Sequence, residues 1–182
     1  MELLASEGRI ESNEIFHNEV GIWQNGGANN IISSNRVYDN GPRGSDSLGS
    51  GIVIHDDAGV PTFNQVTGNQ VHGNAGHGIV VYGNANLVQS NVIQANGIAG
   101  LKLARSQGTL IVANHICGNG THGDPQPAPR IDAAAAGILF SDTGVVGADI
   151  SGNRISSNLG SGIYVEDALG ATFGNVVHDI IT

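Results

Sequence analysis

Four side chains that could transfer protons or stabilise charge stand two to five residues after a Gly followed by Ile or Leu. Lys102 or Tyr82 could remove a proton from a uronate sugar, as a β-elimination lyase requires. Arg105 could stabilise the negative charge that then develops, and Asp142 could join a second carboxylate as the acid/base pair of a hydrolase. These are the candidate catalytic residues. Alternatively, Arg105 and Asp142 form an ordinary surface ion pair worth about 0–1 kcal/mol.

Side chains suited to binding a sugar or a cation stand at related positions after the repeated glycines. Trp23 and Tyr164 offer flat apolar surfaces with a polar edge. The candidate substrate-binding residues are Trp23, Tyr164, His55, Glu166 and Asp167. Asp56 and Asp57 are candidate metal ligands, and Ca²⁺ is the cation that such carboxylates would hold. Hydrogen bonding within their own turn explains these two Asp residues equally well.

These offsets depend on a repeat that runs through the chain. An opening Asn recurs at spacings of 22, 34, 22, 23, 39 and 22 residues, at Asn13, Asn35, Asn69, Asn91, Asn114, Asn153 and Asn175. A second Asn follows five residues later in six repeats, at Asn18, Asn40, Asn74, Asn96, Asn119 and Asn158. A period near 22 residues with turn residues at fixed offsets is typical of solenoids. Asn tolerates left-handed turns, and stacked amides can form ladders, so we expect both rows to build turns.

Apolar residues also recur, in four rows that are predicted to point inward. The first two rows flank the opening Asn, as Ile10, Ile32, Val66, Val88, Ile111 and Ile150, and as Ile15, Val37, Val71, Ile93, Ile116, Ile155 and Val177. The other two rows lie in the segment after the repeated glycine, where two inward residues stand on either side of one outward residue. These pairs are Ile52/Ile54, Ile79/Val81, Leu101/Leu103, Ile138/Phe140 and Ile163/Val165. Alternation with period two indicates β-strands. The sequence therefore predicts an all-β solenoid with three short strands per coil.

The pattern N-x-[IV]-x-x-N-x-x-[HS]-G-[IL]-x-[VIL], present at Asn69 to Val81 and at Asn153 to Val165, carries a resemblance. It is similar to the right-handed parallel β-helix repeats of carbohydrate-active proteins, in particular to the catalytic modules of mannuronan carbon-5 epimerases. The resemblance implies a single-stranded right-handed parallel β-helix of about six to seven coils. It also implies lyase-like or epimerase-like action on an acidic polysaccharide, in a groove on the outer face of one sheet. The epimerase segment Tyr-Gly-x-Asp-Pro-His is absent, so no catalytic residue is carried over, and a non-catalytic glycan-binding or structural solenoid is the alternative.

The chain is predicted to be one β-helix domain over residues 1–182. Its first repeat is under way by Ile10, as in a fragment of a longer chain. Insertions at 41–50 and 120–136 lengthen two repeats, and both leave from the same corner, where they could wall the groove. Solenoid ends expose unpaired strand edges, so end-to-end self-association is expected.

Charge and composition limit the classes of binding partner that we expect. The formal net charge is −9, with 16 acidic and 7 basic residues, which opposes a phosphate backbone, so a nucleic-acid partner is not expected. No apolar run of about 18 residues could span a membrane, and no secretory signal sequence starts the chain. The β-helix resemblance still suggests an extracellular or cell-surface location. A polyuronate partner would need a bridging cation such as Ca²⁺ between like charges.

Overall fold

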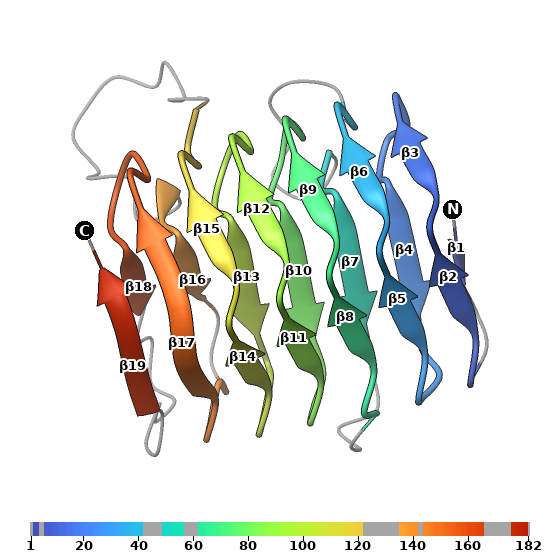
Figure 1. Cartoon of the computed structure of the whole chain (residues 1–182). Helices are drawn as coiled ribbons and strands as arrows, with labels where there is room; N and C mark the ends of the chain where they lie inside the picture. Colours follow the sequence, from blue (N-terminus) through green and yellow to red (C-terminus); the bar gives the residue numbers. More distant parts are fainter. Residues whose placement is uncertain are drawn as a thin grey trace.

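Short strands separated by Asn and Gly corners form a stack of parallel coils in the computed structural model (Figure 1). The structure describes residues 6–41, 49–56, 62–121, 135–141 and 144–165, together with the backbone of 2–3 and 176–181. Every pairing between the named strands is parallel. The predicted all-β parallel solenoid with three short strands per coil is therefore confirmed.

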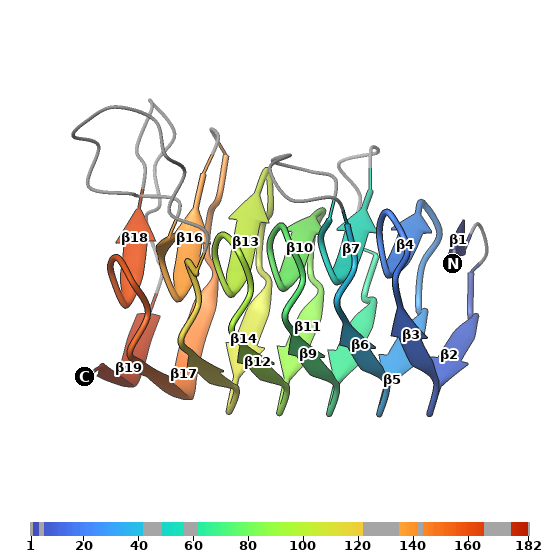
Figure 2. The ribbon, with the colours of Figure 1, turned by 90° about the horizontal axis from the view of Figure 1, so that it is seen from above.

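One side of the stack is a seven-stranded sheet whose members come from successive coils. Its order is β1 (Glu2–Leu3), β4 (Ile22–Asn25), β7 (Ile52–His55), β10 (Ile79–Tyr82), β13 (Leu101–Ala104), β16 (Ile138–Phe140) and β18 (Ile163–Val165). Figure 2 shows this sheet along one side of the molecule and the other strands along the opposite side.

The remaining strands form a bent twelve-stranded sheet, to which each coil contributes two segments. The first segments are β2 (Arg9–Glu11), β5 (Ile31–Ser33), β8 (Gln65–Thr67), β11 (Leu87–Gln89) and β14 (Leu110–Val112). The second segments are β3 (Glu14–Phe16), β6 (Arg36–Tyr38), β9 (Gln70–His72), β12 (Val92–Gln94) and β15 (His115–Cys117). In β17 (Asp149–Ser156) the two segments are continuous, and β19 (Val176–Ile181) pairs with β17.

The core is a column of stacked apolar side chains between the two sheets. The predicted inward residues from Ile10 to Ile155 are buried, and they form one continuous cluster. Ile163 is only partly buried, and Val165 is 44% exposed, because β18 is the last strand of its sheet. One inward position is polar: Gln24 is fully buried in the row that continues with Ile54.

Each coil turns three corners, and a left-handed residue marks each one. We call the corner at the opening Asn the first, the corner at the second Asn the second, and the corner between the seven-stranded sheet and the next coil the third. At the first corner the residues with positive φ are Ser12, Ser34, Gly68, Ser90, Ala113 and Gly152. At the third corner they are Glu7, Asn29, Phe63, Ala85, Gly108 and Gly147. The same backbone geometry in every coil keeps the strands in register.

The Asn rows at the first two corners form the predicted ladders. In the first ladder, Asn69 Nδ2 donates to Asn91 Oδ1 at 3.0 Å and to the Ile32 carbonyl at 2.9 Å. In the second, Asn74 Nδ2 donates to Asn96 Oδ1 at 2.9 Å. Their predicted role in building the corners and forming ladders is confirmed for the described residues.

A third ladder, which the sequence analysis did not predict, lies at the third corner. The Asn64 backbone N–H donates to Asn86 Oδ1 at 3.0 Å, and the Asn30 N–H donates to Asn64 Oδ1 at 2.9 Å. On the following coil Thr109 replaces Asn, so this ladder is short. Within the described part of the chain, no helix is long and apolar enough to cross a membrane.

Candidate functional site

The outer face of the seven-stranded sheet carries five of the sequence-predicted site residues, namely Trp23, His55, Tyr82, Lys102 and Tyr164. Strand register places in one outward row Trp23, Val53, Val80, Lys102, Leu139 and Tyr164. A second row, at the carboxyl ends of the strands, pairs Asn25 with His55, His55 with Tyr82 and Tyr82 with Ala104. Both rows agree with the register predicted from the repeat. Trp23 and Tyr164 are five strand spacings apart, roughly 24 Å, so the face suits a polymer.

The centre of this face is more covered than an open sugar-binding surface would be. Val53, Val80 and Leu139 are only 4–5% exposed although they point away from the main core. Leu139 belongs to a separate apolar cluster with Ala99 and Ala136, against which Tyr164 packs. The accessible groups are therefore the larger side chains at Trp23, Tyr82, Lys102 and Tyr164, which are all partly exposed.

Three of the predicted residues come together as an aromatic group on β4, β7 and β10. The His55 ring lies 6.1 Å from the Trp23 ring and 5.4 Å from the Tyr82 ring, the latter in an edge-to-face arrangement. Edge-to-face packing is a favoured geometry for aromatic pairs. The three side chains thus form a partly exposed surface beside the strand that carries Lys102.

His77 is a further polar residue on this face, and the sequence analysis did not select it. It is 4% exposed, and its Nδ1 accepts the Ala99 backbone N–H at 3.2 Å. The proton of the neutral ring therefore lies on Nε2. Burial and the nearby Lys102 charge lower the pKa of His77 to about 3. Because His77 is the only histidine in its row, no repeated pattern in the sequence could identify it.

The remaining predicted catalytic residue within the described part of the chain is Arg105. It is exposed, has a left-handed backbone with φ of 48°, and follows β13 directly. Its predicted neighbour Asp142 lies outside the described residues, as do Asp57, Glu166 and Asp167. The ion pair between Arg105 and Asp142 and the roles of the other three residues stay predictions.

Asp56 is held in a network of side-chain hydrogen bonds at the third corner. Its Oδ2 accepts from Thr62 Oγ1 at 2.7 Å and from Asn64 Nδ2 at 3.3 Å, and its Oδ1 accepts from Gln24 Nε2 at 3.3 Å. Among the described residues, no three His, Cys, Asp or Glu side chains gather as a metal-binding group. The assignment of Asp56 to a metal site stays a prediction, and the described groups around its carboxylate are neutral hydrogen-bond donors.

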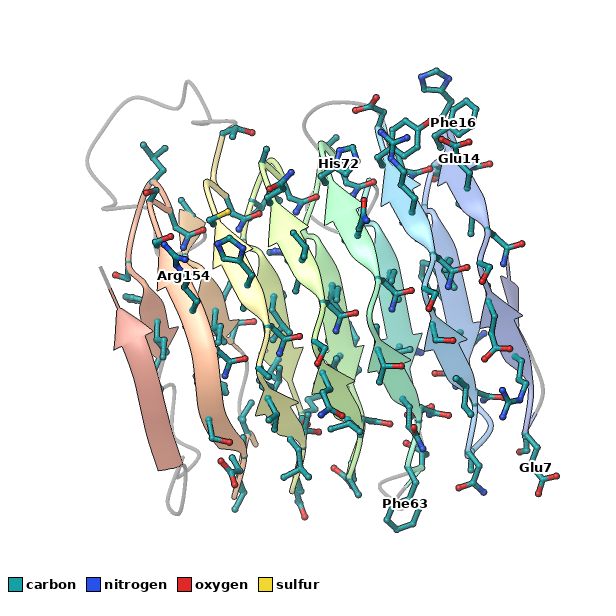
Figure 3. The ribbon with its side chains drawn as sticks, in the orientation of Figure 1. Glu7, Glu14, Phe16, Phe63, His72 and Arg154 are labelled. Carbon is teal, nitrogen blue, oxygen red and sulfur yellow. The ribbon has the colours of Figure 1, made fainter. Side chains whose placement is uncertain are left out.

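A second exposed feature is an aromatic stack on the twelve-stranded sheet, whose residues occupy equivalent positions of the repeat and were given no role from the sequence (Figure 3). The Tyr38 ring stacks on Phe16 and on His72, with 5.1 Å between ring centres on each side. Arg36 lies over the Tyr38 ring at 4.5 Å and pairs with Glu14 at 3.1 Å. Burial and the Arg36 charge lower the pKa of His72. The stacked rings cover each other's faces, which favours a structural role over sugar stacking.

Solved structures resemble the chain in fold at low sequence identity. The crystal structure of the Dettilon tailspike protein matches with a TM-score of 0.67 and 16% identity over 94% of this chain and 36% of the tailspike chain. The A-module of the Azotobacter vinelandii mannuronan C-5 epimerase AlgE4 matches with a TM-score of 0.53 and 17% identity. That match covers 99% of this chain and 54% of the epimerase chain. The chain thus spans about a third to a half of the length of these neighbours.

No curated protein matches the sequence. Residues 2–93 match the family described as right handed beta helix region, which agrees with the expected handedness and with the parallel coils. Since the match covers half of the chain, the protein belongs to the right handed beta helix region family.

Proposed function

We propose that the protein binds an acidic polysaccharide along the outer face of its seven-stranded sheet. The observation that carries this proposal is the partly exposed group of Trp23, His55 and Tyr82 next to Lys102 on the neighbouring strand. Aromatic side chains supply apolar contact to sugar rings, and an ammonium group attracts a uronate carboxylate. The epimerase neighbour, by its name, acts on mannuronan, which is a polysaccharide of this acidic class.

The proposed activity at this face is elimination or epimerisation at a uronate. Tyr82 or Lys102 would transfer the proton, and Arg105 would stabilise the enolate-like charge. Ca²⁺ would then bridge the polymer and the acidic protein surface. These roles follow from residue type and from position on the face.

A non-catalytic glycan-binding solenoid is the second candidate. It is favoured by the burial of Val53, Val80 and Leu139, which fills the middle of the face with packed apolar side chains instead of converging polar groups. A catalytic groove more often places several polar groups against one sugar. Both candidates share the binding surface, so only an activity measurement separates them.

The experiment combines binding and turnover on matched polymers. Polymannuronate, pectate and a neutral glucan are each incubated with the protein, with and without Ca²⁺. Ultraviolet absorbance of unsaturated uronates, reducing ends and proton NMR are then followed. A lyase raises the first two signals, a hydrolase raises only the second, an epimerase changes only the NMR spectrum, and a binding protein changes none of the three.

Calorimetric binding to the best polymer then tests the surface itself. We expect Trp23→Ala and Lys102→Met to weaken binding, whereas Gln70→Ala, an exposed change on β9 of the other sheet, leaves it unchanged. Equal affinity for the neutral glucan and the acidic polymers would exclude the proposed substrate class. Equal losses for Gln70→Ala and Trp23→Ala would exclude the proposed face.

A further inference from the structure

The outer face of the first segments of the twelve-stranded sheet is uncharged over four successive coils. Strand register places the outward residues of β5, β8, β11 and β14 in two rows, which are Ile31, Gln65, Leu87 and Leu110, and Ser33, Thr67, Gln89 and Val112. We call these two rows the neutral face. None of their residues is Asp, Glu, Lys or Arg, although the chain has 16 acidic and 7 basic residues. Charged residues border the face on both sides, with Arg9 and Glu11 on β2 and Asp149 on β17.

Apolar side chains on and beside the neutral face are open to solvent. Leu110 is 43% exposed, and Ile31, Leu87 and Val112 are partly exposed. Phe63, at the third corner just before β8, is 55% exposed and projects from the end of the stack (Figure 3). Its backbone is left-handed, at a position where other coils carry Asn29, Ala85, Gly108 and Gly147. A bulky residue in this conformation is unusual, so the exposed Phe63 ring needs a reason other than building the corner.

The strand order makes this face complementary to itself. The six neighbouring strands are β2, β5, β8, β11, β14 and β17 (Figure 1). If a second copy is turned by 180° about the strand direction, β2 of one copy faces β17 of the other, β5 faces β14, and β8 faces β11. Ile31 then lies opposite Leu110 of the second copy, which forms an apolar pair. A two-fold axis forms each such pair twice.

The charged borders of the face also match in this orientation. Arg9 of one copy lies opposite Asp149 of the other, because both residues stand at the same level of the strand register. Within its own copy Arg9 already pairs with Glu11 at 2.9 Å, so Asp149 would be its second carboxylate. At the third corner the large Phe63 ring lies opposite the small Ala85. Opposite charges and a large side chain facing a small one both favour this orientation.

The net charge favours the neutral face as the place where two copies meet. Two chains with a formal charge of −9 repel each other, and the neutral face adds no like charges to the contact. A centre without charges and a polar rim are typical of protein–protein interfaces. Six strands about 4.8 Å apart and about 20 Å between the two corners give roughly 500 Å² per copy, or about 1,000 Å² in total. This total is at the lower limit for a specific interface.

We propose that two copies of the chain associate through their neutral faces as a weak two-fold dimer with antiparallel solenoid axes. This contact differs from the end-to-end association expected from the sequence, because it uses the face of a sheet and not the edges of its last strands. It does not depend on the polysaccharide proposal, since the seven-stranded sheet lies on the opposite side of the molecule (Figure 2).

Sedimentation equilibrium of the full chain tests the association itself, over a dilution series that reaches about 1 mM. We expect a reversible change from the 18.6 kDa monomer toward twice that mass. Added salt screens the repulsion between the two acidic chains and should strengthen the dimer. A chain that stays monomeric at about 1 mM, or one that forms larger species in place of a dimer, overturns the proposal.

Two matched variants test whether the neutral face is the contact. Leu110→Asp puts a charge into the uncharged centre, twice by symmetry, and should weaken the dimer at least about tenfold. Leu159→Asp makes the same change at a 65% exposed side chain outside the face and should leave the dimer unchanged. Equal effects of the two variants overturn the proposal. If circular dichroism shows that Leu110→Asp does not fold, Gln89→Asp in the other row decides by the same comparison.

A charge exchange tests the orientation of the two copies. Arg9→Asp places two carboxylates opposite each other and should weaken the dimer, and adding Asp149→Arg should restore it. A folded double variant that stays as weak as Arg9→Asp overturns the antiparallel arrangement. If the chain stays monomeric and Leu110→Asp instead abolishes binding of a neutral glucan, the face binds a glycan and the proposal of a dimer is wrong.

Discussion

The glycine directly before each of the strands β4, β7, β10, β13 and β16 is required by close contact between coils. A Cβ atom at Gly78 would lie 2.5 Å from the Gly100 carbonyl oxygen and 2.5 Å from Ile93 Cγ2. Neither atom belongs to a flexible exposed side chain. We therefore expect Gly78→Ala to lower the free energy of unfolding by about 1–3 kcal/mol. Urea denaturation measures this loss, and Ser90→Ala, at an exposed first corner, should stay within about 0.5 kcal/mol of the wild type. Equal stability of the two variants would contradict the packing described here.

Because of His77, the free energy of unfolding is expected to fall as the pH is lowered. Its folded pKa is lowered to about 3 from an ordinary value of 6.5, so the unfolded chain binds the proton more readily. The stability from the neutral ring is complete above pH 6.5 and is lost as the pH falls toward 3, by up to about 1.4 kcal/mol per pH unit. Other groups titrate in this window, so urea melts at pH 7 and pH 5 should compare the wild type with His77→Gln. The variant should show a smaller loss between the two pH values, and an equal loss would exclude this role of His77.

At the scale of the elements, the Asn ladders replace conventional turns and bind the coils together. Asn96 Oδ1 accepts from the N–H and Nδ2 of Asn74, and Asn96 Nδ2 donates to Asn119 Oδ1 at 3.0 Å and to the Val71 carbonyl at 3.2 Å. Removing the Asn96 side chain leaves buried polar groups without partners, at a cost of about 1–3 kcal/mol for each.

We therefore expect Asn96→Ala to destabilise the protein strongly, and Asn18→Ala in the same ladder to cost much less. The Asn18 side chain is exposed, and its Nδ2 donates to Asn40 Oδ1 at a longer 3.2 Å. Thermal and urea melts of the two variants provide the comparison. If Asn18→Ala costs as much as Asn96→Ala, burial of the ladder is not the source of its contribution.

The sequence predicted the strands and the outward rows because a fixed period places equivalent residues on top of each other. It missed the third ladder, since Asn30, Asn64 and Asn86 are interrupted by Thr109 and no longer recur at every repeat. Gln24 and its contacts with Asp56 were missed for a related reason. A single polar residue in an apolar row carries no periodic pattern, and its partner is 32 residues away.

Buried outward residues were equally hard to foresee. Period-two alternation assigns Val53, Val80 and Leu139 to the outer side of a strand, but it does not say what packs over that side. Contacts such as that between Leu139 and Ala136 depend on how the corners fold back over the sheet. The sequence therefore predicted which residues of the candidate site share an outward row, but it did not predict how exposed their side chains are.

At the scale of the whole molecule, the stacked coils separate the requirements of folding from those of function. The inward rows and ladders repeat in almost every coil, whereas Trp23, His77 and Lys102 each occur once in their rows. Neighbouring coils supply the contacts that each of these residues needs. A solenoid can thus change single outward or corner residues without altering the core.

The same separation predicts that the insertion at 120–136 can be replaced by a short turn. In the preceding coil, Gly97-Ile98-Ala99 joins the second Asn to Gly100. Gly120 N–H donates to the Asn96 carbonyl at 2.9 Å, as Gly97 N–H does to the Asn74 carbonyl at 2.8 Å. At the other end of the insertion, the Ala136 carbonyl accepts the Gly100 N–H at 3.1 Å, as the Ala99 carbonyl accepts the Gly78 N–H at 3.0 Å. Both ends of the insertion therefore already occupy the hydrogen-bonding positions of the short turn.

We expect replacement of 120–136 by Gly-Ile-Ala to give a soluble protein with an unchanged far-ultraviolet circular dichroism spectrum. Its urea midpoint should equal or exceed that of the wild type, because a shorter connection costs less closure entropy. A variant that exchanges 120–136 for Gly and Ser residues of equal length is the matched control for lost loop contacts. If both variants fold but only the short turn loses polysaccharide binding, the length of the loop shapes the groove. If the short turn fails to fold while the Gly-Ser variant succeeds, the corner geometry differs between these coils and the assumed equivalence of their turns is wrong.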